Sequence, residues 1–313
     1  MLDKVLSLSF IVMTLAAAVR TASPILLAAI GEIFSERSGV LNVGLEGQML
    51  MGALFGFLGA YFFGSHLAGV ALGMVAGALI ALIVAVMSVS LFADQVVTGV
   101  TINVLCLGIT TYVYKASFGV SMTMPTVETM PRIHVPLLST IPFLGPVLFQ
   151  HKMFVYLAAA IAAAAAFLLY RTTIGLNIRA VGEHPLAAET MGVNVKRTRY
   201  ACVILSGVLA GLGGALLSIG EVGYFTLNMT AGRGFMGLAI VVFGGWDPLS
   251  AWLTSLLFSA ADSLQWSLQV IGVGVPPQLM SSLPYLLPIV ALTVARTRSK
   301  APAALAQPFA KEG

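Results

Sequence analysis

Residues 68–92 read AGVALGMVAGALIALIVAVMSVSLF and contain no charged side chain. An α-helix needs about 20 mostly apolar residues to cross the hydrocarbon core of a bilayer, so this stretch predicts a transmembrane helix. Comparable apolar runs recur along the chain, at 8–34, 41–62, 96–115, 153–170, 199–219, 249–271 and 282–295. They leave no room for a separate soluble domain, and residues 1–313 are therefore predicted to form a single transmembrane domain.

The composition supports this reading. Hydrophobic residues make up 58% of the 313 residues and charged residues only 9%, whereas a soluble domain carries roughly a quarter charged residues. A chain so poor in charge cannot cover a water-facing surface, which excludes a soluble enzyme, a nucleic-acid-binding protein and a disordered regulator. The predicted fold class is all-α, a polytopic membrane protein whose outer surface meets lipid.

The number of spans depends on two unusual runs. Residues 234–245 are too few to cross comfortably and predict a half-helix or a short, steep crossing. The first run contains Arg20 and Pro24 and is too long for one straight span, so it is either one bent helix or a surface helix that leads into a span. The count is therefore nine transmembrane helices, or ten if the first run crosses twice.

The order of the runs suggests internal symmetry. Four runs precede residues 153–170 and four follow them, and each set contains a glycine-rich polar turn, at 42–47 and at 232–245. One intervening span would invert the second set relative to the first. This pattern favours two pseudo-repeated, inverted halves with broken or short helices, as in many transporters.

Basic residues predict the orientation. Nine of the sixteen lie in two places: Arg171, Arg179, Lys196, Arg197, Arg199, and then Arg296, Arg298, Lys300 and Lys311. The positive-inside rule puts the loop 171–198 and the tail 296–313 in the cytoplasm, and the tail is expected to be mobile. The proline-rich segment 119–150 then becomes an ordered extracytoplasmic loop, because its prolines forbid a continuous helix.

Residues 36–51 read ERSGVLNVGLEGQMLM and place Asn42, Glu46 and Gln48 near the cytoplasmic mouth of a span. A carboxylate is costly against lipid, so Glu46 should face the protein interior or water. If the segment is helical, Asn42 and Glu46 share one face. Two roles stay open for Glu46, which are contact with a transported solute and binding of backbone groups in the glycine-rich turn. Asn103 and Phe235 are further candidates for the pathway, through hydrogen bonding and through stacking on a ring.

Two glycine ridges lie in later runs, Gly69, Gly73 and Gly77 in one and Gly207 and Gly211 in the other. Ridges of small residues let helix backbones approach closely, which favours packing within the chain and leaves helix sliding as an alternative.

The loop 175–199 reads GLNIRAVGEHPLAAETMGVNVKRTR. Residues 186–190 after Pro185 predict a short helix ended by Gly192. It is too polar to cross the membrane, and it is either a plain basic turn or a docking helix for a cytoplasmic partner.

The order Glu183, Ala187, Ala188 and Gly192 resembles the Ala-Ala-x-x-x-Gly cytoplasmic loop of ABC importer permeases. ERSGVLNVGLEGQMLMGA at 36–53 and GRGFMGLAIVVFGGWDPL at 232–249 are similar to signatures of the nucleoside and simple-sugar branch of the ribose and branched-chain amino-acid permeases. The resemblance implies a permease subunit in a bacterial inner membrane that forms the pathway for a nucleoside or a simple sugar. It assigns coupling to the ATPase to the four loop residues.

The same resemblance implies the partners. These are a cytoplasmic ABC ATPase, a second permease that is identical or homologous, an extracytoplasmic substrate-binding protein or lipoprotein, and membrane lipid. None of the six lysines follows a glycine, so the chain has no Gly-Lys-Ser/Thr phosphate loop, and ATP hydrolysis is expected on a partner subunit. The four histidines lack the spacing of metal ligands, so we expect no metal, no cofactor and no catalytic residue in this chain.

Two other classes remain as alternatives. An ion-coupled secondary transporter or a channel would be supported by buried charges near mid-membrane, in which this sequence is poor. An intramembrane enzyme would need paired acidic or histidine residues inside the bilayer. Glu46, Asp94, Asp247 and Asp262 are possible, but the last three are expected near the membrane edges. Copurification with an ATPase would separate these classes from an importer subunit.

Overall fold

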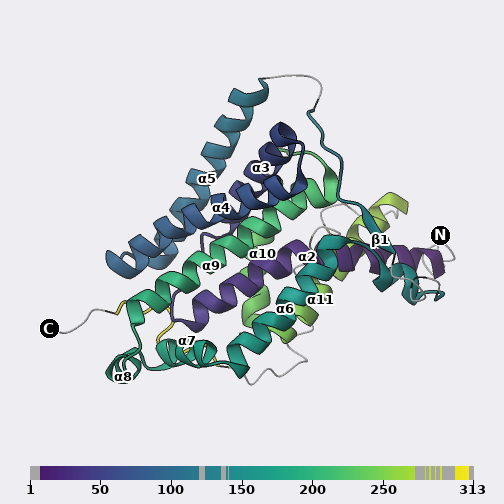
Figure 1. Ribbon diagram of the computed structural model, residues 1–313. Coiled ribbons are helices and arrows are strands. Elements are labelled where there is room, and N and C mark those ends of the chain that lie inside the picture. Colours follow the sequence, from purple (N-terminus) through teal and green to yellow (C-terminus); the bar gives the residue numbers. More distant parts are fainter. Residues whose placement is uncertain are drawn as a thin grey trace.

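The computed structural model describes residues 8–119, 124–134, 139, 141–271 and 300–309, together with positions 279, 282, 286 and 290. Helices dominate this part of the chain (Figure 1). In chain order its elements are α2 (Leu8–Arg37), α3 (Leu45–Phe63), α4 (His66–Ala85), the π-helical turn η1 (Val86–Ser90), α5 (Gln95–Phe118), β1 (Arg132–His134), η3 (Gly145–Phe149), β2 (Gln150–Lys152), α6 (Met153–Arg171), α7 (Thr173–Glu183), α8 (Pro185–Thr190), α9 (Val195–Ala215), η4 (Leu216–Val222), α10 (Arg233–Phe243) and α11 (Pro248–Ile271).

Helix α9 lies at the centre of the bundle and packs along α2, α3 and α4 (Figure 1). Its glycines make this packing close. A Cβ atom on Gly77 of α4 would lie 2.1 Å from the carbonyl oxygen of Gly207, and one on Gly211 would lie 2.3 Å from that of Gly73. The two predicted glycine ridges therefore pack against each other, and the prediction of packing within the chain is confirmed.

Five of the described helices are long and apolar enough to cross a membrane: α2, α4 with η1, α5, α6, and α9 with η4. Helices α3 and α11 coincide with the predicted runs 41–62 and 249–271, and α10, with 11 residues, is the short helix predicted near 234–245. The first run is one continuous helix of 30 residues with Pro24 inside it, not a surface helix joined to a span.

The run 282–295 lies almost wholly outside the described residues. The total of nine or ten spans and the inverted repeat therefore stay predictions.

The segment 119–150 is an ordered connection in its described part, and it departs from a purely helical fold. Strands β1 and β2 pair antiparallel, with Ile133 opposite His151. Thr126 also forms a bridge with Tyr224, which ties this connection to the segment after η4.

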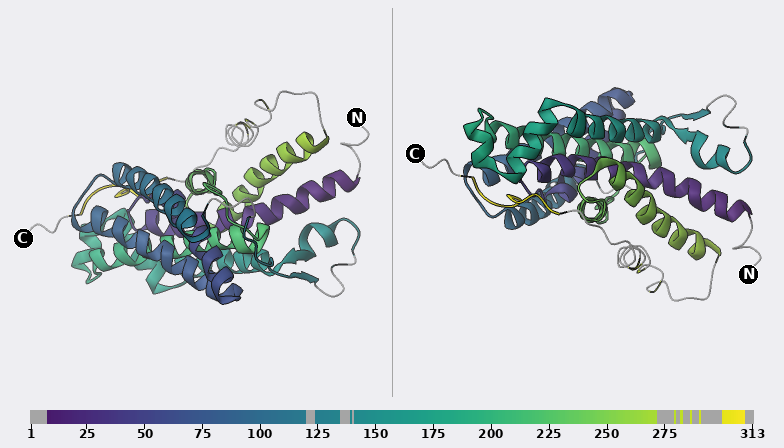
Figure 2. Two further views of the ribbon diagram at one scale, coloured as in Figure 1. Left: turned by 90° about the horizontal axis from the view of Figure 1, so that it is seen from above. Right: turned by 90° about the horizontal axis from the view of Figure 1, so that it is seen from below.

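The described part of the tail packs on the rest of the chain. Residues 300–309 lie against the end of the molecule that carries α7 and α8 (Figures 1 and 2). Ala304 is 3% exposed, and its N–H donates to the carbonyl of Gly182 at 2.9 Å. This packing differs from the expectation of a mobile tail, because the backbone of the segment has partners that its alanine- and proline-rich composition does not reveal.

Candidate functional site

Glu46 is the carboxylate that the sequence singled out, and it binds the start of α10. It lies in the first turn of α3 and is 8% exposed. Its Oε1 accepts hydrogen bonds from the Thr230 hydroxyl at 2.5 Å and the Gly232 N–H at 2.9 Å, and its Oε2 accepts from the Gly234 N–H at 2.7 Å. The first N–H groups of a helix lack partners within the helix and carry partial positive charge, so a carboxylate there satisfies and stabilises them.

The contact between these two segments depends on a glycine. A Cβ at position 234 would lie 2.5 Å from the Cα of Glu46, so a larger residue would push α10 away from α3. The GRGF stretch at the start of α10 and the GLEG stretch at the start of α3, 188 residues apart, thus form one structural unit.

Asn42 and Gln48 form a second cluster, beside Glu46 but separate from it. Their side-chain amides exchange hydrogen bonds of 2.9 and 3.1 Å, and Asn42 also donates to the Ser206 hydroxyl of α9 at 3.1 Å. Glu32 of α2 completes the cluster by accepting from the Asn42 backbone N–H at 2.7 Å and from Ser206 at 3.2 Å. All four residues are buried, so this cluster joins α2, α3 and α9.

The condition under which Asn42 and Glu46 would share a helix face, a helical segment from 42 to 46, is not met. Helix α3 begins at Leu45, so Asn42 lies in the irregular turn that precedes it. The glycine at position 39 has a φ of +91°, which a helix cannot contain. The two side chains consequently serve different partners, Asn42 toward α9 and Glu46 toward α10.

The other two pathway candidates differ in their surroundings. Asn103 of α5 accepts a hydrogen bond from the Gly47 N–H at 2.8 Å and donates to the Val43 carbonyl at 2.9 Å, so it holds the same turn from a third side. Phe235 of α10 is 46% exposed. Among the five candidates it is the one whose side chain is displayed rather than used inside the fold.

Sequence reasoning missed two buried carboxylates of α2. Glu32 is completely buried, and Glu36, one helical turn later, is 2% exposed. Glu36 accepts a short hydrogen bond from the Trp246 indole N–H, while the Arg37 side chain donates to the Trp246 carbonyl at 3.1 Å. The ERSG and GGWD stretches had been quoted as motifs, and the charge of Glu36 inside an apolar chain was the signal that could have connected them.

The loop 171–198, which we name the coupling loop after the role that the motif resemblance implies, contains two helices, although the sequence predicted one. Helix α8 matches the prediction, and Gly192 follows it with a φ of +88°. Helix α7 precedes it and was missed. Ala187 is exposed, whereas Ala188 is 5% exposed and packs with Val181 of α7 and Val195 of α9.

This packing changes what Ala188 can do. Its side chain belongs to a small apolar core and is not displayed for a partner. Glu183, at the end of α7, accepts a hydrogen bond from the Ala303 N–H of the tail at 3.3 Å.

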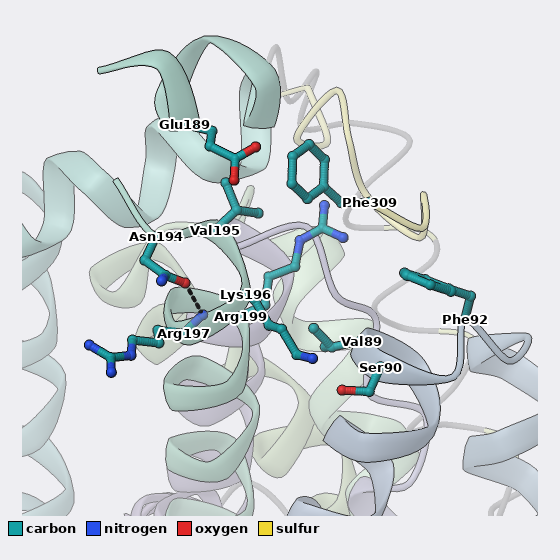
Figure 3. Close-up of a pocket in the computed structure, with 10 residues that line it drawn as sticks. All are labelled: Val89, Ser90, Phe92, Glu189, Asn194, Val195, Lys196, Arg197, Arg199 and Phe309. Carbon is teal, nitrogen blue, oxygen red and sulfur yellow. Dashed lines mark hydrogen bonds between the residues drawn. The ribbon is translucent and has the colours of Figure 1, made fainter. Parts of the chain in front are cut away.

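A cavity of about 510 Å³ lies beside this loop, between η1, the start of α9 and the tail. Figure 3 shows its lining, in which Phe309 lies beside the guanidinium of Arg199 and the Arg197 side chain points away from them. The described residues contain no group of three or more His, Cys, Asp or Glu side chains placed to hold a metal ion.

The fold and these contacts define a class of protein. The chain is a polytopic membrane protein. Its backbone departs from helical geometry at both glycine-rich turns, and a small helical loop lies outside the bundle. This is the architecture of a transport permease. It belongs to the family of branched-chain amino acid transport system permease components, whose family model matches residues 14–292.

Similar proteins cover nearly the whole chain. The guanosine ABC transporter permease protein NupQ of Bacillus subtilis is 42% identical over 299 residues, which is 93% of this chain and 94% of NupQ. The nucleoside ABC transporter permease protein NupC of Lactococcus lactis is 37% identical, over 90% and 92% of the two chains. The putative glucose ABC transporter permease protein TsgC13 of Haloferax volcanii is 35% identical, over 97% and 99%. No solved structure matches.

The family and these relatives confirm the resemblance seen in the motifs. The chain is a permease subunit and not an enzyme, and the alternatives of an ion-coupled carrier, a channel and an intramembrane enzyme are set aside. Permeases of this class work with separate ATPase subunits and with substrate-binding components.

Proposed function

We propose that this chain forms the translocation pathway for a nucleoside in an ATP-driven importer. The observation that carries the proposal is the 42% identity to a guanosine permease across nearly the full length of both chains. The nucleoside permease of Lactococcus lactis supports the same class. A simple sugar is the second candidate, because the glucose permease of Haloferax volcanii is 35% identical over a similar share.

The proposed assembly contains a second permease, identical or homologous, together with the ATPase and an extracytoplasmic binding protein or lipoprotein. ATP is bound and hydrolysed on the ATPase, and this chain carries no cofactor. In the proposed orientation, the loop 171–198 and the C-terminal tail lie in the cytoplasm and the loop 119–150 lies outside, following the distribution of basic residues.

The coupling loop is the proposed contact with the ATPase, with a division of labour among its residues. Ala187 is exposed on α8, as are Leu186 and Met191, at 64% and 85%. These side chains are free to enter a cleft on a partner. Ala188 holds α8 in place through its packing on α7 and α9, and Glu183 holds the end of α7 through its hydrogen bond with the tail. Gly192 turns the chain away after α8.

The pathway residues divide in the same manner. Four of the candidates form hydrogen bonds with the backbone and side chains of this chain, which supports a structural role for Asn42, Glu46, Gln48 and Asn103. Phe235, half exposed on the short helix α10, is the proposed stacking surface for a nucleobase.

Transport by a purified system tests the substrate. The permease, its ATPase and its binding protein are placed in liposomes with internal ATP, and uptake of labelled guanosine is measured with unlabelled guanosine, uridine or glucose as competitors. We expect nucleosides to compete and glucose to fail. Competition by glucose alone would show that the substrate is a sugar and not a nucleoside. Uptake without an ATPase would overturn the ATP-driven mechanism.

A further inference from the structure

Residues 300–309 bind three separate parts of the membrane domain. The Ala306 N–H donates to the carbonyl of Gly39, in the turn after α2, at 3.1 Å. The Ala304 N–H donates to the carbonyl of Gly182 in α7, at 2.9 Å. The carbonyl of Gln307 accepts from Nη1 of Arg199 in α9, at 2.9 Å. Hydrogen bonds of backbone N–H and C=O groups hold the segment in place and do not depend on which side chains it carries.

The turn after α2 is shaped to receive this segment. A Cβ on Gly39 would lie 2.9 Å from Nη2 of Arg199 and 3.0 Å from the carbonyl oxygen of Ala304. Arg199 is 2% exposed, and its Nε donates to the Ser38 carbonyl at 3.2 Å. A single buried guanidinium therefore binds the turn and the tail together.

The last described residue of the tail reaches the coupling loop. Phe309 packs against the cluster of Val181, Ala188 and Val195, which belong to α7, α8 and α9. Its ring also lies under the guanidinium of Arg199, 6.0 Å from it (Figure 3). One aromatic side chain thus packs on the cluster that includes the buried residue of α8 and lies beside Arg199, which anchors the tail on α9.

Helix α8 needs such support. It has six residues, and isolated helices shorter than about 12–15 residues are marginal in water. Its stability must come from packing, and among the described residues its buried side chain is Ala188 alone. Ala188 belongs to the small cluster against which Phe309 packs, so the tail contributes to the packing that positions α8.

We propose that residues 300–309 form a strap that holds α8 on the membrane domain, and that Phe309 is the positioning residue through which a displacement of α8 reaches Arg199 and α9. The transport consequence rests on the proposed function, whereas the mechanical role of the strap does not. Because α9 packs along α2, α3 and α4, a movement passed to its first turn acts on the centre of the bundle.

Phe309→Ala tests the mechanical role, with Lys300→Ala as the control. The control removes an exposed side chain at the other end of the same segment. Hydrogen exchange is measured on the purified full-length permease. We expect exchange within 185–190 to rise roughly tenfold in Phe309→Ala, which corresponds to about 1.4 kcal/mol, with no change in the control or in residues 203–215 of α9. Phe309→Leu should lie between the wild type and Phe309→Ala.

The same variants in the assembled importer test the consequence. Phe309→Ala should still bind the ATPase but lose at least half of the uptake per ATP hydrolysed, while Lys300→Ala behaves as the wild type. Unchanged exchange in 185–190 overturns the strap, whatever the transport result. Raised exchange in a permease that binds no ATPase keeps the strap and overturns the proposed function, so the two failures are distinguishable.

Discussion

Replacing Glu46 by alanine should destabilise the protein through the start of α10. The substitution removes the acceptor for the Thr230 hydroxyl and for the N–H groups of Gly232 and Gly234. Hydrogen bonds to a charged group contribute roughly 1.5–3 kcal/mol each, but the three act on one carboxylate and are not additive. Gly232 is only half-buried, so water replaces part of the loss. We expect the free energy of unfolding to fall by about 2–3 kcal/mol.

Glu46→Gln separates charge from shape. It keeps one oxygen acceptor and loses the second, along with the favourable charge at the N-terminus of α10. We expect it to cost about half as much as the alanine change. Glu128→Ala is the control, since Glu128 is exposed in the connection that follows α5.

Stability is measured by unfolding of the purified permease in a denaturing detergent, and hydrogen exchange is followed in residues 232–243. A structural role predicts that stability and exchange change together with uptake. If uptake falls in both variants at unchanged stability, Glu46 contacts the solute instead. Wild-type uptake and stability in Glu46→Ala would refute both readings.

Three further outcomes are expected. Cysteines introduced at Pro131 and Lys196 should label from opposite faces of intact cells, and labelling from the same side would overturn the proposed topology. Gly77→Val should cost about 1–3 kcal/mol, because a Cβ there meets the Gly207 carbonyl, whereas Gly108→Val on α5, where no atom lies near, should be neutral in unfolding. Ala187→Arg should abolish ATP-driven uptake in a normally stable permease, whereas Ala188→Arg should also destabilise the loop, as measured by proteolysis of residues 173–198.

The helices could be predicted from the sequence because the bilayer imposes their length. The apolar runs, the short α10 and the end of α8 at Gly192 all follow from hydropathy and glycine chemistry. The buried faces of the helices could not be read in the same way. Helix α4 is apolar on all sides, and it buries Gly73 and Gly77 while exposing Leu79 and Leu82. In lipid, close packing of small residues decides which face is inside, and apolarity does not.

The polar contacts escaped prediction for a different reason. Glu46 was singled out as a carboxylate that lipid would not tolerate, and Asn42 and Gln48 as polar groups near the mouth of a span. The need for a partner does not identify that partner. Their partners Ser206 and Thr230 lie 164 and 184 residues from Asn42 and Glu46. Serine and threonine are common enough in any chain that nothing in the sequence marks these two. The strap was missed because it binds through backbone groups, which every sequence has.

The turn at 38–44, between α2 and α3, is where these contacts meet. Irregular backbone inside a membrane protein is tolerated only where the protein satisfies its polar groups, and here the partners come from four different elements. The partners are Arg199 of α9 for the Ser38 carbonyl, Ala306 of the strap for Gly39, Gln95 of α5 for Leu41, Glu32 of α2 for Asn42, and Asn103 of α5 for Val43.

A turn held in this manner cannot move alone. A shift of the strap or of α9 breaks bonds at positions 38 and 39, and a shift of α5 breaks bonds at 41 and 43. The adjoining Glu46 carries the position of α3 to α10 through three further bonds. The contact surface proposed for the ATPase, on α8, is therefore joined to the short helix that displays Phe235 by an unbroken series of hydrogen bonds and side-chain packing. Under the proposed function, this series is the route by which closure of the ATPase subunits reaches the pathway.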